Sequence, residues 1–190
     1  YSLERVHQFN AQDDVDNKDL RIGAITPSLR LDTRDDPLSP TRGWYASTSF
    51  ELAAPWLFSQ SDPFPVGYFR TQGRVDRLIP ITRSITLYLS YRGGFERSSE
   101  AATSEPGSGA IPLIKQFALG GAGSLRGFAE QELNVLDKAI RGTLSYSNYR
   151  MQVDFPFAGA LRFGPFIDGA NLLVDNHSVG QFFFESVRFG

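Results

Sequence analysis

The sequence contains no cysteine, which excludes disulfide bonds and thiolate metal sites. Its two histidines, His7 and His177, lie far apart and have no ligand-like neighbours, so we expect neither a metal ion nor another cofactor. No apolar run approaches the roughly 18 residues that a transmembrane helix requires. The formal net charge is −2, so no basic excess indicates a nucleic-acid partner. Evidence about the fold and the function therefore has to come from the order of polar and apolar residues along the chain.

What is present is an alternation of apolar and polar residues with a period of two, the pattern of β-strands with two different faces. The clearest segments are Trp44–Leu52, Ile85–Arg92, Tyr149–Phe155 and Leu161–Asp168, and weaker ones are Leu20–Arg34 and Tyr68–Ile79. The two ends, Tyr1–Phe9 and Phe182–Gly190, look like parts of two more strands. Apart from a short turn near Glu130–Val135, no segment has a helical pattern. The sequence predicts an all-β domain of about eight strands.

The two faces of these strands differ in a way that favours a membrane barrel over a soluble protein. The polar face carries charges of both signs near mid-strand, which suits a wet or ion-paired interior: Arg30, Asp32, Arg150, Asp154, Arg162 and Asp168. The apolar face carries aromatic residues near strand ends, which suits lipid contact between interfacial girdles: Trp44, Tyr91, Tyr149 and Phe155. A soluble β-sandwich with one face in its core would alternate in the same way, so this pattern alone leaves it open.

The connections between the expected strands alternate in character along the chain. The tighter ones are Asp35–Gly43, Pro80–Arg83 and Pro156–Gly159, and the longer ones are Asn10–Asp19, Ser59–Pro65, Gly93–Gly142 and Asn171–Gln181. Outer-membrane barrels have tight turns at one end and long loops at the other. The alternation therefore favours an antiparallel up-and-down barrel, although Asp35–Gly43 is the least tight of the turns.

The segment Phe117–Phe128, FALGGAGSLRGF, is the most unusual stretch of the sequence, with four glycines around the single charge of Arg126. It lacks the Lys-Ser/Thr pair of a P-loop and no helical pattern follows it, which argues against phosphate binding. A solvated loop tip is the plain alternative. Against that alternative stand four apolar residues that a solvated tip does not need: Phe117, Leu119, Leu125 and Phe128.

The segment Asp32–Gly43, DTRDDPLSPTRG, has a structural explanation as a stiff turn built on Pro37, Pro40 and Gly43. Its carboxylates could form an acid–base cluster. Because Arg34 and Arg42 lie close by, local ion pairing is the more economical interpretation.

Together with FIDGANL at Phe166–Leu172, these two segments resemble the BamA/TamA family of outer-membrane assembly factors, in the family's order and with similar spacing. The resemblance covers nearly the whole chain. In that family the proline-rich stretch is a periplasmic turn, which here comprises Asp32, Arg34, Asp35, Asp36, Pro37, Pro40 and Gly43. The glycine-rich stretch is the signature of the long sixth extracellular loop, which here comprises Gly120, Gly121, Gly123, Ser124, Leu125, Gly127 and Phe128.

The resemblance implies a sixteen-stranded transmembrane barrel, of which residues 1–190 would be a middle part without the periplasmic repeats. It also implies that the loop, about residues 93–142, folds back into the barrel interior. There Arg126 would need a carboxylate. Asp154 and Asp168 both lie on the polar face of their strands and match the family's acidic partners, so we expect a loop-lock ion pair of Arg126 with Asp168, and with Asp154 as a second or water-bridged partner.

The function that the resemblance implies is the folding and insertion of other barrel proteins into the bacterial outer membrane, without enzymatic activity, nucleotide or metal. The expected partners are outer-membrane lipids, unfolded outer-membrane clients and accessory assembly subunits. Within the same superfamily, a two-partner secretion pore or a phospholipase-linked barrel is the alternative. A plain diffusion porin is a further alternative from another class.

Overall fold

A computed structural model of the chain describes residues 1–7, 19–61, 65–99, 111–134, 143–158, 161–174 and 187–190. The predictions at His177 and Asn10–Lys18, and most of Phe182–Gly190, lie outside these residues. The strands are β1 (Ser2–His7), β2 (Asp19–Ile25), β3 (Ser28–Asp32), β4 (Gly43–Ala53), β5 (Tyr68–Pro80), β6 (Thr86–Ser98), β7 (Thr143–Ala158), β8 (Leu161–Phe163), β9 (Phe166–Val174) and β10 (Arg188–Phe189). Two single turns of 3-10 helix, η1 (Pro55–Leu57) and η2 (Leu113–Lys115), complete the described elements.

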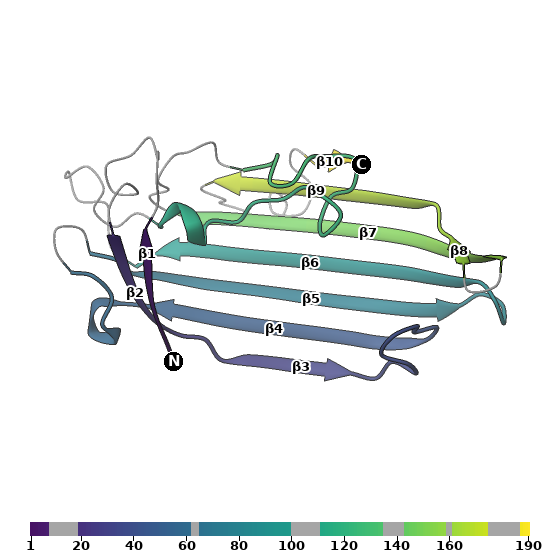
Figure 1. Cartoon of the computed structure of the whole chain (residues 1–190), viewed down its shortest axis with the longest axis horizontal. Coiled ribbons are helices and arrows are strands. Elements are labelled where there is room, and N and C mark those ends of the chain that lie inside the picture. Colours follow the sequence, from purple (N-terminus) through teal and green to yellow (C-terminus); the bar gives the residue numbers. More distant parts are fainter. Residues whose placement is uncertain (8–18, 62–64, 100–110, 135–142, 159–160, 175–186) are drawn as a thin grey trace.

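All ten strands belong to one antiparallel sheet in the order β1-β2-β4-β5-β6-β7-β9-β10, with β3 beside β4 and β8 beside β7 (Figure 1). This path has eight positions, so the prediction of an all-β antiparallel sheet of about eight strands is confirmed. Within the described residues, no helix is long and apolar enough to cross a membrane; that finding concerns helices alone.

Two segments predicted as single strands are each divided in two by a proline. The alternation of Leu20–Arg34 is broken at Pro27 between β2 and β3, and that of Leu161–Asp168 is broken at Pro165 between β8 and β9. Proline has no N–H to donate to a neighbouring strand, so the ladder cannot continue through it. The proline carbonyls still accept hydrogen bonds from β4 and β7, at Phe50 N (3.0 Å) and Val153 N (3.1 Å).

The alternation gives the sheet two chemically different faces. One face, which we call the inner face, carries buried polar side chains: Asp76, Glu96, Asn148 and Asp168 are at most 2% exposed. The opposite, outer face carries exposed apolar side chains such as Leu29, Trp44, Phe50, Val75 and Ile167. A sheet with an apolar exposed face and a polar covered face is the arrangement of an outer-membrane barrel wall, and the reverse of a soluble sandwich.

The connections lie at two ends of the sheet (Figure 1). Short turns join β3 to β4 and β5 to β6 at one end, which we call the turn end, and longer connections leave β4 and β6 at the other. The long connection starts later than predicted, because β6 continues through Gly93 and Gly94 to Ser98. The pair Gly93 and Gly94 therefore lies within the strand. A Cβ at Gly94 would collide with the rings of Phe117 and Tyr146, so the glycine leaves room for packing.

The expected aromatic girdle is only partly present. Trp44 and Phe155 lie close to the turn end of their strands. Tyr91 and Tyr149 were expected near strand ends and instead lie mid-strand, with ring centroids 5.3 Å apart. The prediction was wrong for these two residues because β6 and β7 extend well beyond the short segments in which the alternation is clearest.

Candidate functional site

Residues 111–134 of the long connection pack against the inner face of the sheet. Leu119 and Leu125 are buried with Ala170 of β9, and Phe117 is buried with Leu144 of β7. An isolated antiparallel bridge between Leu119 and Leu133 closes the segment on itself. The apolar residues that argue against a solvated loop tip are thus the ones that pack against the sheet.

Arg126 lies at the centre of this contact and is joined to Asp168 of β9. Its Nε is 2.7 Å from Asp168 Oδ2 and its Nη2 is 2.8 Å from Oδ1, and its backbone N–H also donates to Oδ2 at 3.2 Å. The Asp168 side chain is fully buried, and that of Arg126 is 21% exposed. A planar guanidinium fork that donates twice to one carboxylate is the stronger class of ion pair, because both hydrogen bonds are charge-assisted.

Asp154, the second expected partner, does not touch Arg126 directly. Gln152 stands between them, since its Oε1 accepts from Arg126 Nη1 at 2.6 Å and its Nε2 donates to Asp154 Oδ1 at 2.7 Å. A side-chain amide therefore makes the connection for which the sequence suggested direct contact or water. A Cβ at Gly164 would collide with Asp154, so this glycine makes room for the group.

Besides Gln152, sequence reasoning missed three side chains that complete the site. Arg150 Nε lies 3.2 Å from Asp168 Oδ1, so this carboxylate faces two cations. Arg92, Asn148 and Arg150 donate to the backbone carbonyls of residues 122–124. The alternation of the sequence does place all three on the same face of the sheet as Asp154. It does not predict which loop atoms each of them contacts.

The glycines of the loop motif have separate roles. Gly120, Gly121 and Gly127 have positive φ values of 130°, 76° and 93°, whereas nothing lies within 4 Å of a Cβ at Gly123. At Gly120 a side chain would also overlap the carbonyl oxygen of Ala129. Ser124 Oγ closes the turn by donating to Gly120 O at 2.8 Å and accepting from Gly120 N at 2.7 Å. Phe128 packs at the edge of the Leu125 cluster.

A second contact, also on the inner face, joins η2 to strands β1 and β4. Lys115 Nζ lies 3.0 Å from Glu4 of β1 and 3.3 Å from Glu51 of β4. Next to it, the guanidinium of Arg70 lies over the Phe117 ring at 4.6 Å and its Nε is 3.0 Å from Glu96 Oε1. Glu96 is fully buried, and neither of its carboxylate oxygens has a hydrogen bond within the described part of the chain.

The proline-rich turn is held by its own carboxylates. Asp35 accepts from the backbone N–H groups of Thr41 (2.9 Å) and Arg42 (3.1 Å) and from the Thr41 hydroxyl, and these hydrogen bonds lower the pKa of Asp35. Asp36 accepts from the N–H groups of Leu38 and Ser39, which lowers its pKa. Carboxylates engaged in this way are structural and poorly suited to acid–base chemistry.

The other members of the turn motif lie where its closure requires them. The Arg34 side chain makes two hydrogen bonds to Asp32, with Nε 2.8 Å from Oδ1 and Nη2 2.7 Å from Oδ2. Gly43 has a φ of 114°, and a Cβ there would collide with the carbonyl of Thr33. Pro37 is exposed in the turn, and Pro40 is partly buried. In the part of the chain that the structure describes, no cluster of acidic and histidine side chains could hold a metal ion.

An exposed apolar outer face, a polar inner face and a long connection anchored across that inner face together define an outer-membrane type of barrel wall. A family model described as the Omp85 superfamily domain matches residues 2–189, and the chain belongs to this superfamily. The resemblance to the BamA/TamA family is thereby confirmed. At the level of the superfamily, the location is an outer membrane.

One curated protein and one solved structure are similar to the chain. A SAM50-like protein of Schizosaccharomyces pombe is 31% identical over 134 residues, which are 70% of this chain and 26% of that protein. The crystal structure of BamA from Haemophilus ducreyi lacking POTRA domains 1–3 matches with a TM-score of 0.60 at 17% identity, over 83% of this chain and 31% of that chain. The chain thus spans about a quarter of the curated relative and about a third of the solved structure.

Proposed function

We propose that this chain is part of the barrel of an outer-membrane protein assembly factor, which folds and inserts other β-barrel proteins. The observation that carries the proposal is that the ion pair of Arg126 with Asp168 fixes residues 111–134 across the inner face of the sheet. A loop anchored in this way occupies part of the barrel interior, in contrast to the open, water-filled channel of a diffusion porin. The clients are unfolded outer-membrane proteins, and accessory assembly subunits are the expected partners.

In this proposal Arg126, Asp154 and Asp168 act as a lock that fixes the loop inside the barrel while a client strand is handled elsewhere on the wall. The lock is supported by the buried Asp168 carboxylate, whose charge is offset by Arg126 and Arg150 together. A docked loop also supplies an apolar cluster at Leu125 that would otherwise be exposed. Its release would open the interior and expose both the charges and the cluster.

The test is client folding by the full-length protein reconstituted in lipid vesicles. A urea-unfolded outer-membrane barrel is added, and its folding is followed by the shift in electrophoretic mobility of unheated samples. We expect Arg126→Ala and Asp168→Ala to slow folding strongly. Arg30→Ala is the matched control, because Arg30 is an inner-face arginine that pairs with Asp32 and not with the loop.

Two other outcomes separate the assembly function from the lock. Ion conductance without acceleration of client folding would indicate a porin or a secretion pore and would contradict the proposal. Folding that is accelerated equally by the wild type and both variants would keep the assembly function and remove the lock.

We further propose that the membrane is the bacterial outer membrane, which the resemblance in the sequence motifs supports. The alternative is the mitochondrial outer membrane, in line with a relative from a yeast. Fractionation of the source organism distinguishes the two, because the protein should sediment with membranes that contain lipopolysaccharide.

A further inference from the structure

The outer face of the sheet contains a groove that begins beside an arginine at the turn end. The groove has a volume of about 860 Å³ and is lined mainly by apolar side chains, among them Trp44, Val75, Leu89, Met151 and Ile167, with Arg77 at its edge. Trp44 and Arg77 are direct neighbours on β4 and β5, and the guanidinium lies over the indole ring at 4.6 Å. Tryptophan at a strand end is typical of the membrane interface.

A second hollow, a cleft of about 440 Å³, adjoins the groove on the turn side. Thr33, Arg42 and Gly43 line it together with Arg77, which therefore borders both the cleft and the groove. Among the described residues, neither Arg42 nor Arg77 has a side-chain ion pair or hydrogen bond. Asp35 also lines the cleft, but its carboxylate is occupied by the donors of Thr41 and Arg42 N. Arg42 and Arg77 thus border this cleft without a side-chain ion pair among the described residues.

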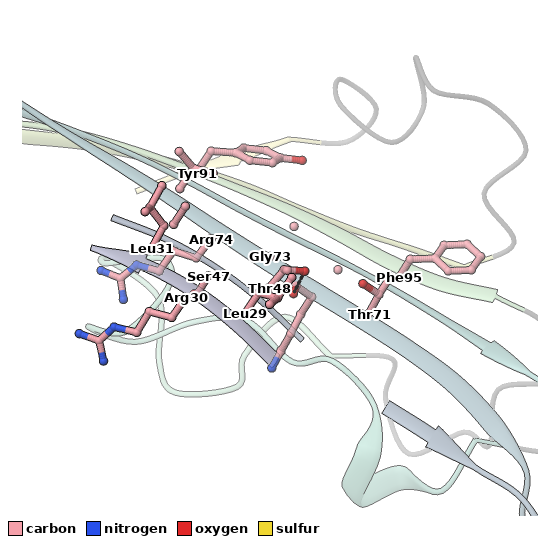
Figure 2. Close-up of a pocket in the computed structure, with 15 residues that line it drawn as sticks. Leu29, Arg30, Leu31, Ser47, Thr48, Thr71, Gly73, Arg74, Tyr91 and Phe95 are labelled. Atoms are coloured by element: carbon pink, nitrogen blue, oxygen red, sulfur yellow. Dashed lines mark hydrogen bonds between the residues drawn. The ribbon is translucent and has the colours of Figure 1, made fainter. Parts of the chain in front are cut away.

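The groove continues along β5 toward the middle of the sheet. A hollow of about 540 Å³ shares Val75 and Tyr91 with it and crosses the small residues Thr48, Gly73 and Gly93. Figure 2 shows this hollow, with the rings of Tyr91 and Phe95 standing to either side of Gly73. Arg77, Val75 and Gly73 point to the same face, and four residues of strand span roughly 13 Å. The row therefore forms an apolar path that leads away from the two arginines.

We propose that this surface binds one phospholipid with an anionic headgroup, its phosphate between Arg42 and Arg77 and an acyl chain along β5 to Gly73. The inference rests on the membrane-facing orientation of the outer face and does not depend on client assembly. Charge complementarity selects this occupant: two unpaired cations match a phosphate, guanidinium groups match its oxygens in pairs, and the apolar path matches a hydrocarbon chain. An anionic lipid also gains from each basic residue close to the membrane surface.

The test uses quenching of Trp44 fluorescence by brominated lipids in the full-length protein, reconstituted with Trp44 as its single tryptophan and Trp56→Phe in this chain. The measured quantity is the binding constant of brominated phosphatidylglycerol relative to brominated phosphatidylcholine. We expect phosphatidylglycerol to be preferred. We expect Arg42→Gln and Arg77→Gln each to lower the preference about fivefold, the factor that corresponds to about 1 kcal/mol per basic residue.

Three variants make the test specific. Arg97→Gln is the matched control, because Arg97 is also exposed on the outer face but lies near the opposite end of β6. Arg77→Lys should keep most of the preference, which separates the loss of charge from a local disruption. Gly73→Leu fills the path without strain, because a Cβ there meets only Ser47 O at 3.7 Å and Thr48 Oγ1 at 4.0 Å.

The position of bromine then locates the chain. Gly73→Leu should weaken quenching by lipids brominated in mid-chain and leave quenching by lipids brominated near the headgroup unchanged. Equal binding constants for the two lipids would overturn the proposal. So would an equal loss of preference in Arg97→Gln and Arg77→Gln, which would show a general surface attraction in place of a site.

Discussion

The long connection touches the inner face at two places, and these differ in how completely their buried charges are hydrogen-bonded. The Arg126 anchor consists of Arg126, Arg150, Gln152, Asp154 and Asp168, and the Lys115 anchor consists of Lys115, Glu4, Glu51, Arg70 and Glu96. At the Arg126 anchor the buried Asp168 carboxylate accepts from two arginines and one backbone N–H. At the Lys115 anchor the equally buried Glu96 carboxylate has a cation nearby but no hydrogen bond in the described residues.

The two loop cations, Arg126 and Lys115, also differ as donors. A guanidinium presents a rigid fork that matches a carboxylate, whereas an ammonium is a compact point charge that can sit between two acids. Arg126 therefore fixes both the position and the orientation of the loop, whereas Lys115 attracts the two acids without fixing an orientation. Burial strengthens a fully hydrogen-bonded network and penalises an incomplete one. We therefore infer that the Arg126 anchor determines how the loop docks and that the Lys115 anchor adds little.

The largest expected effect is that of Asp168→Ala. Without this carboxylate, Arg126 and Arg150 face each other without an anion between them, and breaking a buried pair in this way costs about 3–5 kcal/mol. Arg126→Ala should cost less, because Arg150 still pairs with Asp168 at 3.2 Å. The free energy of loop docking can be measured from the rate of proteolysis of the loop under native conditions.

The double variant Arg126→Ala/Asp168→Ala completes the cycle. If the two residues act as one unit, it should be little worse than Asp168→Ala alone. Additive losses would show that the two side chains contribute independently, and the distinction between the anchors would fail.

The next effect is that of Arg126→Lys, which keeps the charge and removes the fork. A lysine can donate to Asp168, but it cannot also hold Gln152 Oε1, which Arg126 Nη1 reaches at 2.6 Å. Loss of one charge-assisted hydrogen bond predicts a cost of about 1.5–3 kcal/mol in loop docking. Rates of loop proteolysis in Arg126→Lys that equal those of the wild type would mean that charge alone is sufficient.

The sequence predicted the meeting of Arg126 with Asp168 better than it predicted their surroundings. Alternation put Asp168 on the polar face, and the motif resemblance supplied Arg126. The contacts of Lys115 with Glu4 and of Arg126 with Gln152 depend on segments 111 and 26 residues apart, and no local pattern contains that information. The start of the loop was misplaced for a related reason, since Gly94 serves packing with Phe117 and not a turn.

A smaller effect is expected at Glu96. The double variant Arg70→Met/Glu96→Met removes a buried pair that lacks hydrogen bonds, and such replacements are often neutral or stabilising. We expect loop docking to change by no more than about 1 kcal/mol in the unfavourable direction. The matched variant Arg126→Met/Asp168→Met should be clearly destabilising, because it also deprives Arg150 of the Asp168 carboxylate and Gln152 of the Arg126 donor. Equal losses in the two double variants would remove the contrast between the anchors.

The smallest effect is expected for Lys115→Met. Glu4 is 46% exposed, so its pair with Lys115 is screened by water, and Glu51 still accepts from the Tyr68 hydroxyl when the ammonium is gone. Partly exposed pairs of this kind contribute about 0–1 kcal/mol, and the methionine keeps most of the apolar stem in place.

Salt sharpens this last prediction. Raising the ionic strength from roughly 0.15 M to roughly 1 M shortens the screening length from about 8 Å to about 3 Å, so wild-type loop docking should approach that of Lys115→Met. Arg126→Ala should lose docking at both salt concentrations, because its partner is buried. The Lys115→Met and Arg126→Ala losses should also add within about 0.5 kcal/mol, since the two side chains share no partner among the described residues. Strong coupling between the two losses would mean that the two anchors form one network, connected through the loop.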